Sequence, residues 1–125
     1  MRINDPATLA EVTAVFAHYE DVLMRNDVAA LDALFWPSEL AVRYGGGGEN
    51  LYGYDAICAF RAARAGGAPP RRFTRTVITT FGTDFATAST EFEQTANGRS
   101  GRQMQSWARL DGAWRIVAAH ISLVG

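Results

Sequence analysis

Tyr19 and Arg43 are the two residues whose type and setting most suggest chemistry. Tyr19 lies at the centre of an apolar stripe along a predicted helix, so its hydroxyl must point toward the protein interior. There it could donate a proton or a hydrogen bond to a substrate carbonyl, or bond to a nearby backbone group. Arg43 interrupts an apolar strand. Pointing inward it would need an acid or a bound anion, and pointing outward it would be a solvated edge residue. The sequence leaves both pairs of alternatives open.

Other groups that could transfer protons or bind metals are few. His120 could be a general base, although a lone strand histidine is more often a packing residue. Glu91 and Glu93 lie on a strand of unknown register, and inward placement would make either a rival base. The two histidines and the single cysteine, Cys58, show no metal-ligand spacing. We therefore expect neither a metal nor another cofactor.

Composition narrows the class of protein. The chain has 125 residues, 48% of them hydrophobic, which suits one domain over residues 1–125. A net charge of -1 gives no general attraction to nucleic acid or to an anionic membrane, and no segment has the length of a membrane span. A single cysteine permits no intrachain disulfide, so we expect a cytoplasmic protein. All twelve basic residues are arginines, which suit small anionic substrates, although the crowd of arginines between 61 and 75 is more typical of a solvated face.

The predicted elements place helices before a sheet. Asp5 caps a first helix that begins at Pro6, and further helices are expected over 28–35 and from about 54 to 66. A short strand is predicted over 40–44, followed by a glycine loop at 45–48 that we interpret as a mobile rim. From 73 to 123 the chain reads as a four-strand antiparallel meander. The expected fold is α+β, with the helices packed on one face of a curved, mostly antiparallel sheet that can enclose a pocket.

The last hairpin allows its two faces to be separated. The two-residue turn at 111–112 pairs Trp107 with Ile116 and, counted outward, Gln103 with His120. One face then carries Gln103, Gln105, Trp107, Ile116, Ala118 and His120. The other carries Met104, Ser106, Ala108, Val117, Ala119 and Ile121. We assign the first, mixed face to a ligand pocket and the second, apolar face to a homodimer interface.

Several segments together resemble a known family. They are INDP at 3–6, ENLYGYDAI at 49–57, FRAAR at 60–64, RTVITTFGTDFATAST at 75–90, GRQMQSW at 101–107 and WRIVAAHIS at 114–122. In order and spacing they resemble the AtzH-like family, which includes the oxalurate-catabolism protein HpxZ and belongs to the nuclear transport factor 2-like superfamily of ketosteroid isomerases and SnoaL-like cyclases. The glycine stretch at 45–48 is richer in glycine than we expect for the family.

The resemblance implies a cone-shaped α+β barrel, usually dimeric, associated with an amidase-signature hydrolase in bacterial nitrogen catabolism. It implies amide hydrolysis of a small carboxylated urea such as 1,3-dicarboxyurea to allophanate, or a related step on oxalurate. It also implies that Tyr19 and Arg43 are the functional pair.

The chemistry can be written as a hypothesis. Arg43 clamps a substrate carboxylate and Tyr19 donates a proton, while Gln105 and His120, with Trp107 and Gln103 beside them, orient the rest. Attack by water and decarboxylation are both compatible with this pair. Two other classes stay open: a non-catalytic accessory subunit of an amidase-signature hydrolase, and an isomerase or cyclase, which would need an inward acid such as Glu91.

Overall fold

The structure is a computed structural model that describes residues 1–125. Along the chain the elements are α1 (Pro6–Met24), α2 (Val28–Leu34), β1 (Val42–Tyr44), β2 (Asn50–Tyr52), α3 (Tyr54–Ala63), β3 (Arg71–Phe81), β4 (Phe85–Gln94), β5 (Ser100–Leu110) and β6 (Ala113–Leu123). The three predicted helices and the meander are all present. The short strand β2 is not among the predicted elements, and β3 begins two residues before the predicted start at 73.

Capping fixes where the first two helices begin. Asp5 precedes α1, and its carboxylate accepts a hydrogen bond from the backbone N–H of Thr8 at 3.2 Å. Asp27 does the same for α2 through the N–H of Ala30 at 3.1 Å. Gly53 precedes α3 with φ of 90°, a backbone conformation that favours glycine. None of the three helices is long and apolar enough to cross a membrane.

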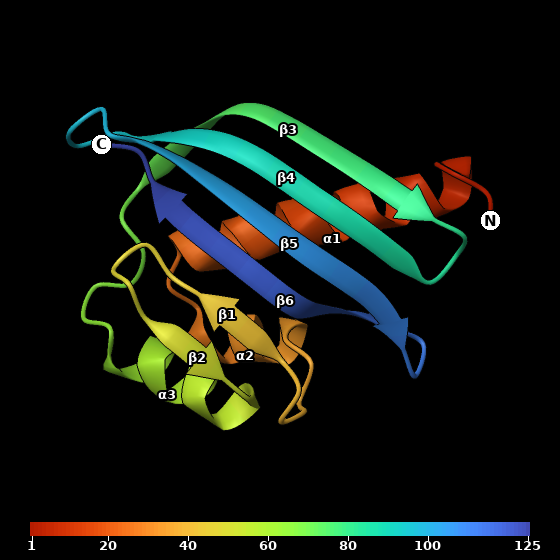
Figure 1. Ribbon diagram of the computed structural model, residues 1–125, viewed down its shortest axis with the longest axis horizontal. Helices are drawn as coiled ribbons and strands as arrows, with labels where there is room; N and C mark the ends of the chain where they lie inside the picture. Colours follow the sequence, from red (N-terminus) through yellow and green to blue (C-terminus); the bar gives the residue numbers. More distant parts are fainter.

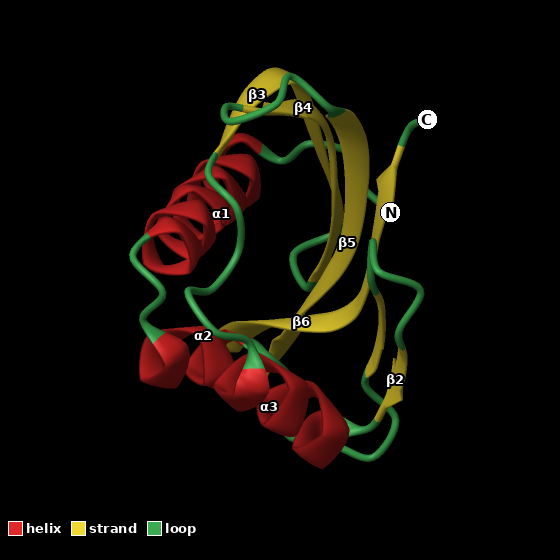
Figure 2. Cartoon of the chain, turned by 90° about the vertical axis from the view of Figure 1, so that its left-hand side faces the viewer, coloured by secondary structure: helices red, strands yellow, loops and turns green.

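One six-stranded sheet contains all the strands, in the order β2-β1-β6-β5-β4-β3. Strand β1 runs parallel to β6, and every other neighbouring pair is antiparallel. Figure 1 shows the long strands β3 to β6 crossing in front of α1. Turned by 90°, the sheet is strongly curved and all three helices lie on one side of it (Figure 2). The predicted α+β arrangement is confirmed.

The hairpin of β5 and β6 contains a β-bulge that the sequence analysis missed. Near the turn the predicted register is present, because Trp107 pairs with Ile116. At the next step Ser106 pairs with Ala118, so Val117 is an extra residue in β6. Because side chains alternate along a strand, one extra residue moves every later side chain of β6 to the opposite face.

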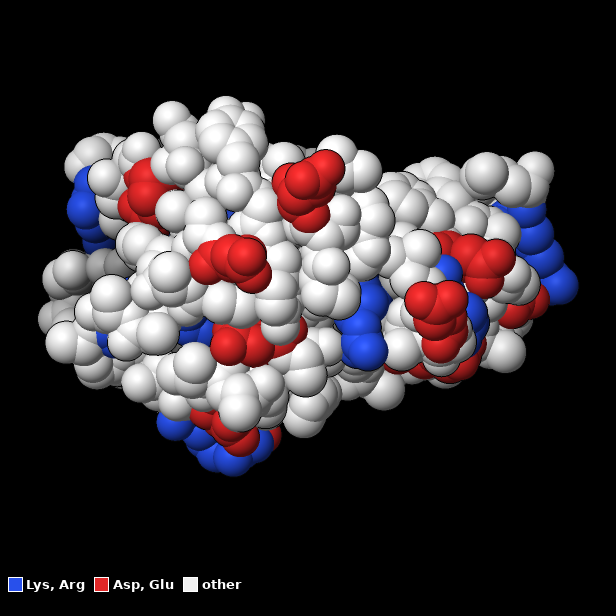
Figure 3. Space-filling model, turned by 90° about the horizontal axis from the view of Figure 1, so that it is seen from below, with Lys and Arg blue, Asp and Glu red and all other residues white.

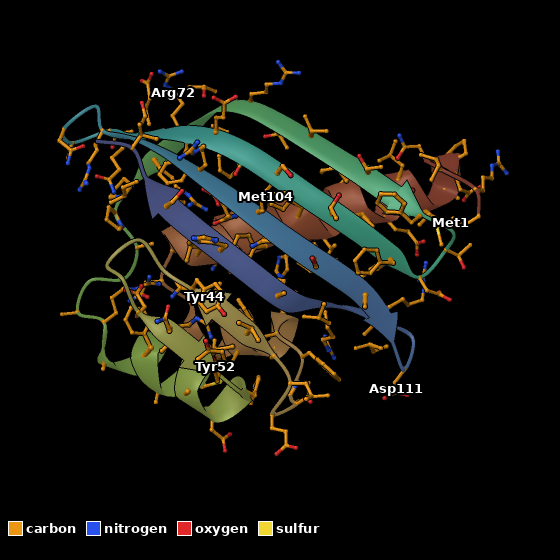
Figure 4. All side chains as sticks on the ribbon, viewed as in Figure 1. Met1, Tyr44, Tyr52, Arg72, Met104 and Asp111 are labelled. Atoms are coloured by element: carbon orange, nitrogen blue, oxygen red, sulfur yellow. The ribbon has the colours of Figure 1, made fainter.

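This change of face corrects two predictions. Gln103 pairs with Ile121 rather than with His120, and His120 pairs with Met104. His120 is therefore exposed on the outer face of the sheet, away from the helices. Ala119 and Ile121 lie on the inner face, so their assignment to a dimer interface was wrong. Figure 4 shows Met104 on the uncovered face, and its side chain is 61% exposed.

The core lies between α1, α2 and the inner face of the sheet. Its buried members include Val12, Phe16, Tyr19, Val22, Leu31, Phe35, Ile57, Trp107 and Ile116. The predicted apolar stripe of α1 is mostly buried, and Tyr19 packs edge-on against Trp107 with ring centroids 6.4 Å apart. The helices thus seal one face of the sheet and leave space near one end.

Candidate active site

A cavity of about 290 Å³ opens between the three helices and the inner face of the sheet. Its apolar wall includes Leu23, Leu31, Phe35, Ile57, Phe60, Phe92, Ile121 and Leu123. Its polar wall consists of Tyr19, Arg43, Glu49, Arg61, Arg64, Arg71 and Gln94. This volume is at the small end of ligand sites, so it suits a metabolite rather than a large molecule.

Tyr19 reaches the cavity from the buried side of α1. Tyr19 is 4% exposed, and its hydroxyl donates a hydrogen bond to Oε1 of Gln103 at 3.5 Å. That distance is longer than a normal O–H···O hydrogen bond, so the phenol is only weakly held by the protein. The same Gln103 Oε1 accepts a shorter bond, 3.1 Å, from Nη2 of Arg71. The hydroxyl therefore has its donor capacity largely free for a ligand.

Arg43 points inward, which the sequence left undecided. The residue is 8% exposed, and its guanidinium lies 5.2 Å from the centroid of the Phe60 ring. Its one ion pair joins Nη1 to Oε1 of Glu49 at 3.4 Å, longer than the roughly 2.7–2.9 Å of a strong charge-assisted hydrogen bond. Burial lowers the pKa of Arg43, and the nearby Tyr19 and Glu49 partly offset this. A buried guanidinium with one long contact can accept a ligand carboxylate.

Arg61 and Arg71 have strong partners of their own. Arg71 forms a bidentate pair with Glu20, with contacts of 2.7 and 3.0 Å. Arg61 is paired with Asp32 and stacks on a core aromatic ring. Both guanidiniums are buried, so removing either partner would leave an uncompensated charge. These two arginines hold the wall of the cavity together.

Arg64 differs because no carboxylate pairs with it. Its Nε is buried without a hydrogen-bond partner, and its guanidinium lies 5.7 Å from the Phe60 ring centroid. Burial, followed by the like charges of Arg43 and Arg61, lowers the pKa of Arg64. Four guanidiniums line the cavity and only three carboxylates pair with them. The cavity therefore carries a surplus of positive charge suited to an anion.

The face of the molecule in Figure 3 shows no comparable surplus of positive charge. On the face of the molecule in Figure 3, basic and acidic side chains are interspersed. No group of three or more acidic, histidine or cysteine side chains is arranged to hold a metal ion. The guanidiniums of the cavity can bind the carboxylate of a small ligand, and the Tyr19 hydroxyl can donate a proton to that ligand.

The predicted pocket residues on the last hairpin do not line the cavity. Gln103, Gln105 and Trp107 are at most 2% exposed and lie within the core. Gln105 Oε1 accepts from the indole Nε1 of Trp107 at 3.0 Å, whereas Gln105 Nε2 is buried without a hydrogen-bond partner. Gln103 touches the cavity only through Tyr19 and Arg71. His120 is outside, packed edge-on against Tyr44 with ring centroids 5.7 Å apart.

The two acids weighed as rival bases are also outside. Glu91 is exposed, and Glu93 forms a surface pair with Arg72 at 2.9 Å. Glu91 therefore cannot be the inward acid that the isomerase or cyclase hypothesis needs.

Sequence reasoning missed Glu49 and Arg64 as cavity residues. Glu49 follows the glycine stretch in a loop, where no periodicity predicts direction. Arg64 follows α3 and belongs to the arginines between 61 and 75, whose crowding is more typical of a solvated face. The signal that could have singled it out is its i, i+3 spacing from Arg61, which places two guanidiniums on one side of the helix end.

Comparison with known proteins places the chain in a family. The AtzH-like family matches residues 1–125. A protein of unknown function of the DUF3225 family from Pectobacterium atrosepticum SCRI1043 is 54% identical, with a TM-score of 0.94 and coverage of 98% of this chain and 95% of that one. A cystatin-like fold protein from Burkholderia xenovorans LB400 is 50% identical, with a TM-score of 0.94 and coverage of 100% and 98%.

More distant structures define the fold. A nuclear transport factor 2-like protein of unknown function from Pseudomonas putida KT2440 is 15% identical, with a TM-score of 0.79 and coverage of 93% of this chain and 86% of that one. No curated protein matches the chain. The fold is therefore that of the nuclear transport factor 2-like superfamily, and the chain belongs to the AtzH-like family.

Proposed function

We propose that the protein is an enzyme that hydrolyses a small carboxylated urea, such as 1,3-dicarboxyurea to allophanate, or a related oxalurate-pathway compound. The observation that carries the proposal is the juxtaposition, in one small cavity, of a weakly held phenol with two guanidiniums that lack strong partners. An anionic amide needs a carboxylate clamp and a proton donor, and these side chains supply both.

In this proposal Arg43 binds a substrate carboxylate and Tyr19 protonates the departing nitrogen. For 1,3-dicarboxyurea, one water is consumed and the products are allophanate and bicarbonate. The bond that breaks joins nitrogen to a carboxyl carbon, and Tyr19 supplies the proton that nitrogen gains. Loss of carbon dioxide without attack by water would use the same donor, so the two residues alone support either route.

Arg64 extends the clamp. Because it has no carboxylate partner, a second anionic group on the ligand would neutralise the charge surplus of the cavity. The apolar side chains of Phe60 and Ile57 lower the local polarity beside the guanidiniums, which strengthens the attraction between guanidinium and carboxylate. A ligand with two carboxylates therefore fits this cavity better than one with a single carboxylate.

The uncovered sheet face supports a second part of the proposal, a homodimer. Met104, Val77 and Phe85 are exposed by 61%, 46% and 39% on the face of the sheet that the helices do not cover. Large apolar side chains exposed together on one face of a sheet are typical of an interface. We also propose a functional association with an amidase-signature hydrolase, which the family resemblance implies.

Turnover by the purified protein tests the proposed function. Wild-type protein is incubated with 1,3-dicarboxyurea or oxalurate, and the products are measured by liquid chromatography with mass spectrometry. The proposal expects allophanate from 1,3-dicarboxyurea or a cleavage product from oxalurate, at a rate that rises with protein concentration. If neither compound is consumed and the protein copurifies with an amidase-signature hydrolase, the accessory-subunit reading replaces the enzyme.

A further inference from the structure

Glu49 is the one side chain lining the cavity that can accept a proton at neutral pH. The other polar side chains of the wall are four guanidiniums, one phenol and one amide. Guanidiniums have no lone pair to offer, an amide is not a base, and a phenol is protonated at pH 7. His120, Glu91 and Glu93 lie outside the cavity. Any reaction that removes a proton from water inside this cavity has a single candidate acceptor.

The glycine loop is built around the carboxylate of Glu49. A Cβ on Gly45 would lie 1.7 Å from Glu49 Oε1, and a Cβ on Gly47 would lie 2.8 Å from Oε2. Neither glycine has a positive φ, so what their lack of a side chain provides is space for the Glu49 carboxylate rather than a special backbone conformation. The loop is closed by hydrogen bonds from Gly45 N–H to the Glu49 carbonyl at 3.0 Å and from Gly48 N–H to the Gly45 carbonyl at 3.1 Å. The glycine loop therefore folds closely around the Glu49 carboxylate, which lies beside Arg43.

We propose that Glu49 is the general base that activates the attacking water. Arg43 contacts the Glu49 carboxylate at 3.4 Å and at the same time binds the substrate carboxylate, so that base and substrate meet on one guanidinium. The side chain of Glu49 is 21% exposed, which leaves an oxygen open to a water molecule. Because this proposal rests on the hydrolytic function proposed above, it also selects attack by water over simple loss of carbon dioxide, which needs a proton donor but no base.

The proposed hydrolysis consumes one water molecule and breaks one carbon–nitrogen bond. The water oxygen forms a bond to the carboxyl carbon while one water proton passes to the Glu49 carboxylate. The carbon–nitrogen bond then breaks, its electron pair stays on nitrogen, and nitrogen takes the proton of Tyr19. Transfer of a proton from Glu49 back to the Tyr19 phenolate, through water, restores both groups. No oxidant, reductant or further reactant is needed.

A purely structural role for Glu49 makes different predictions. If Glu49 served only to hold Arg43, its loss would loosen Arg43 and weaken the binding of a ligand carboxylate together with turnover. As a base it acts only in the reaction, and its negative charge competes with the ligand for Arg43. Neutralising it should therefore leave carboxylate binding equal or tighter while turnover falls.

The experiment compares Glu49→Gln with wild type, using malonate as the binding probe in calorimetry and 1,3-dicarboxyurea as the substrate. We expect malonate affinity equal to or higher than wild type, and turnover lower by about 10²–10⁴-fold. Glu91→Gln, which removes an exposed carboxylate outside the cavity, is the matched control and should keep wild-type turnover.

A second variant displaces the carboxylate without removing it. Gly45→Ala places a methyl group where Glu49 Oε1 lies, and the flexible end of that side chain can shift, so the protein should fold. We expect a loss of turnover with malonate binding retained. Gly46→Ala adds the same methyl group 3.4 Å from Leu123 instead, and should lower turnover less than Gly45→Ala.

Three results would overturn the proposal. Wild-type turnover in Glu49→Gln excludes Glu49 as the base while leaving the hydrolase function intact. A joint loss of malonate binding and thermal stability in Glu49→Gln assigns it a structural role. A wild-type protein that consumes no carboxylated urea overturns both this inference and the proposed function.

Discussion

Replacing Tyr19 by phenylalanine separates a chemical role of the hydroxyl from a structural one. The change removes one oxygen, whose hydrogen bond to Gln103 is 3.5 Å long. Gln103 Oε1 still accepts from Arg71 at 3.1 Å, so no buried acceptor is left without a partner. The free energy of unfolding should therefore fall by no more than about 0.5–1 kcal/mol. For a domain of this size that corresponds to a Tm lower by about 2–5 °C.

Turnover of 1,3-dicarboxyurea by Tyr19→Phe should fall by about 10²-fold or more, because phenylalanine cannot donate a proton to the departing nitrogen. Tyr54→Phe is the matched control. The Tyr54 hydroxyl donates to the backbone carbonyl of Asp32 at 3.1 Å, and Tyr54 does not line the cavity. It should lose at least as much stability as Tyr19→Phe and keep wild-type turnover. Equal turnover in Tyr19→Phe and wild type, or an equal loss in both variants, would refute the role of the phenol.

Four further substitutions test other parts of the structure. Arg43→Lys keeps the charge but loses the fork, so KM should rise about 10–100-fold with a lower kcat, and an unchanged KM would contradict the clamp. Arg64→Gln should weaken malonate binding about tenfold without lowering Tm, because no carboxylate depends on Arg64; unchanged binding would contradict its contact with the ligand. Met104→Glu should convert a dimer to a monomer in light scattering, and a monomeric wild type at micromolar concentration would contradict the proposed interface. A hydrogen bond from Arg109 holds the pKa of Glu11 below its usual value, so the stability it contributes is present at pH 7 and is lost as pH falls through the lowered value. Glu11→Gln should therefore have a lower Tm than wild type at pH 7 and an equal Tm well below pH 4, and a constant difference would contradict the linkage.

The fold could be predicted because its signals are local and agree with one another. Asp5 and Pro6 mark the start of α1, and the apolar spacing along that helix fixes which side is buried. The same spacing correctly placed Tyr19 inward. The two-residue turn at 111–112 correctly fixed the register of the adjacent pairs of β5 and β6.

The direction of Arg43 could not be predicted because β1 is only three residues long. A period of two needs more positions than that to show which side is buried. In the structure the direction follows from contacts distant in sequence: parallel pairing with β6 and packing against Phe60. The position of Glu49 could not be predicted either, because the position of its side chain depends on how the glycine loop folds back on itself.

The bulge at Val117 was unpredictable for a different reason. Bulges are often marked by glycine, and the segment around Val117 contains neither glycine nor proline. Counting outward from the turn therefore gave the wrong face for every residue of β6 beyond Ile116. One unpredicted extra residue, Val117, therefore put His120, Ala119 and Ile121 on the wrong faces of the sheet.

The same bulge decides which chemistry the cavity can perform. Without the extra residue, His120 and Ser122 would face inward and the cavity would have an imidazole on its wall. With it, the cavity is lined there by Ile121 and Leu123, which are apolar and cannot transfer protons. Proton transfer must then come from Tyr19 on α1 and from Glu49 after the glycine loop, which also line the cavity. A one-residue insertion in a strand thus moves the chemistry from the sheet to the helix and the glycine loop.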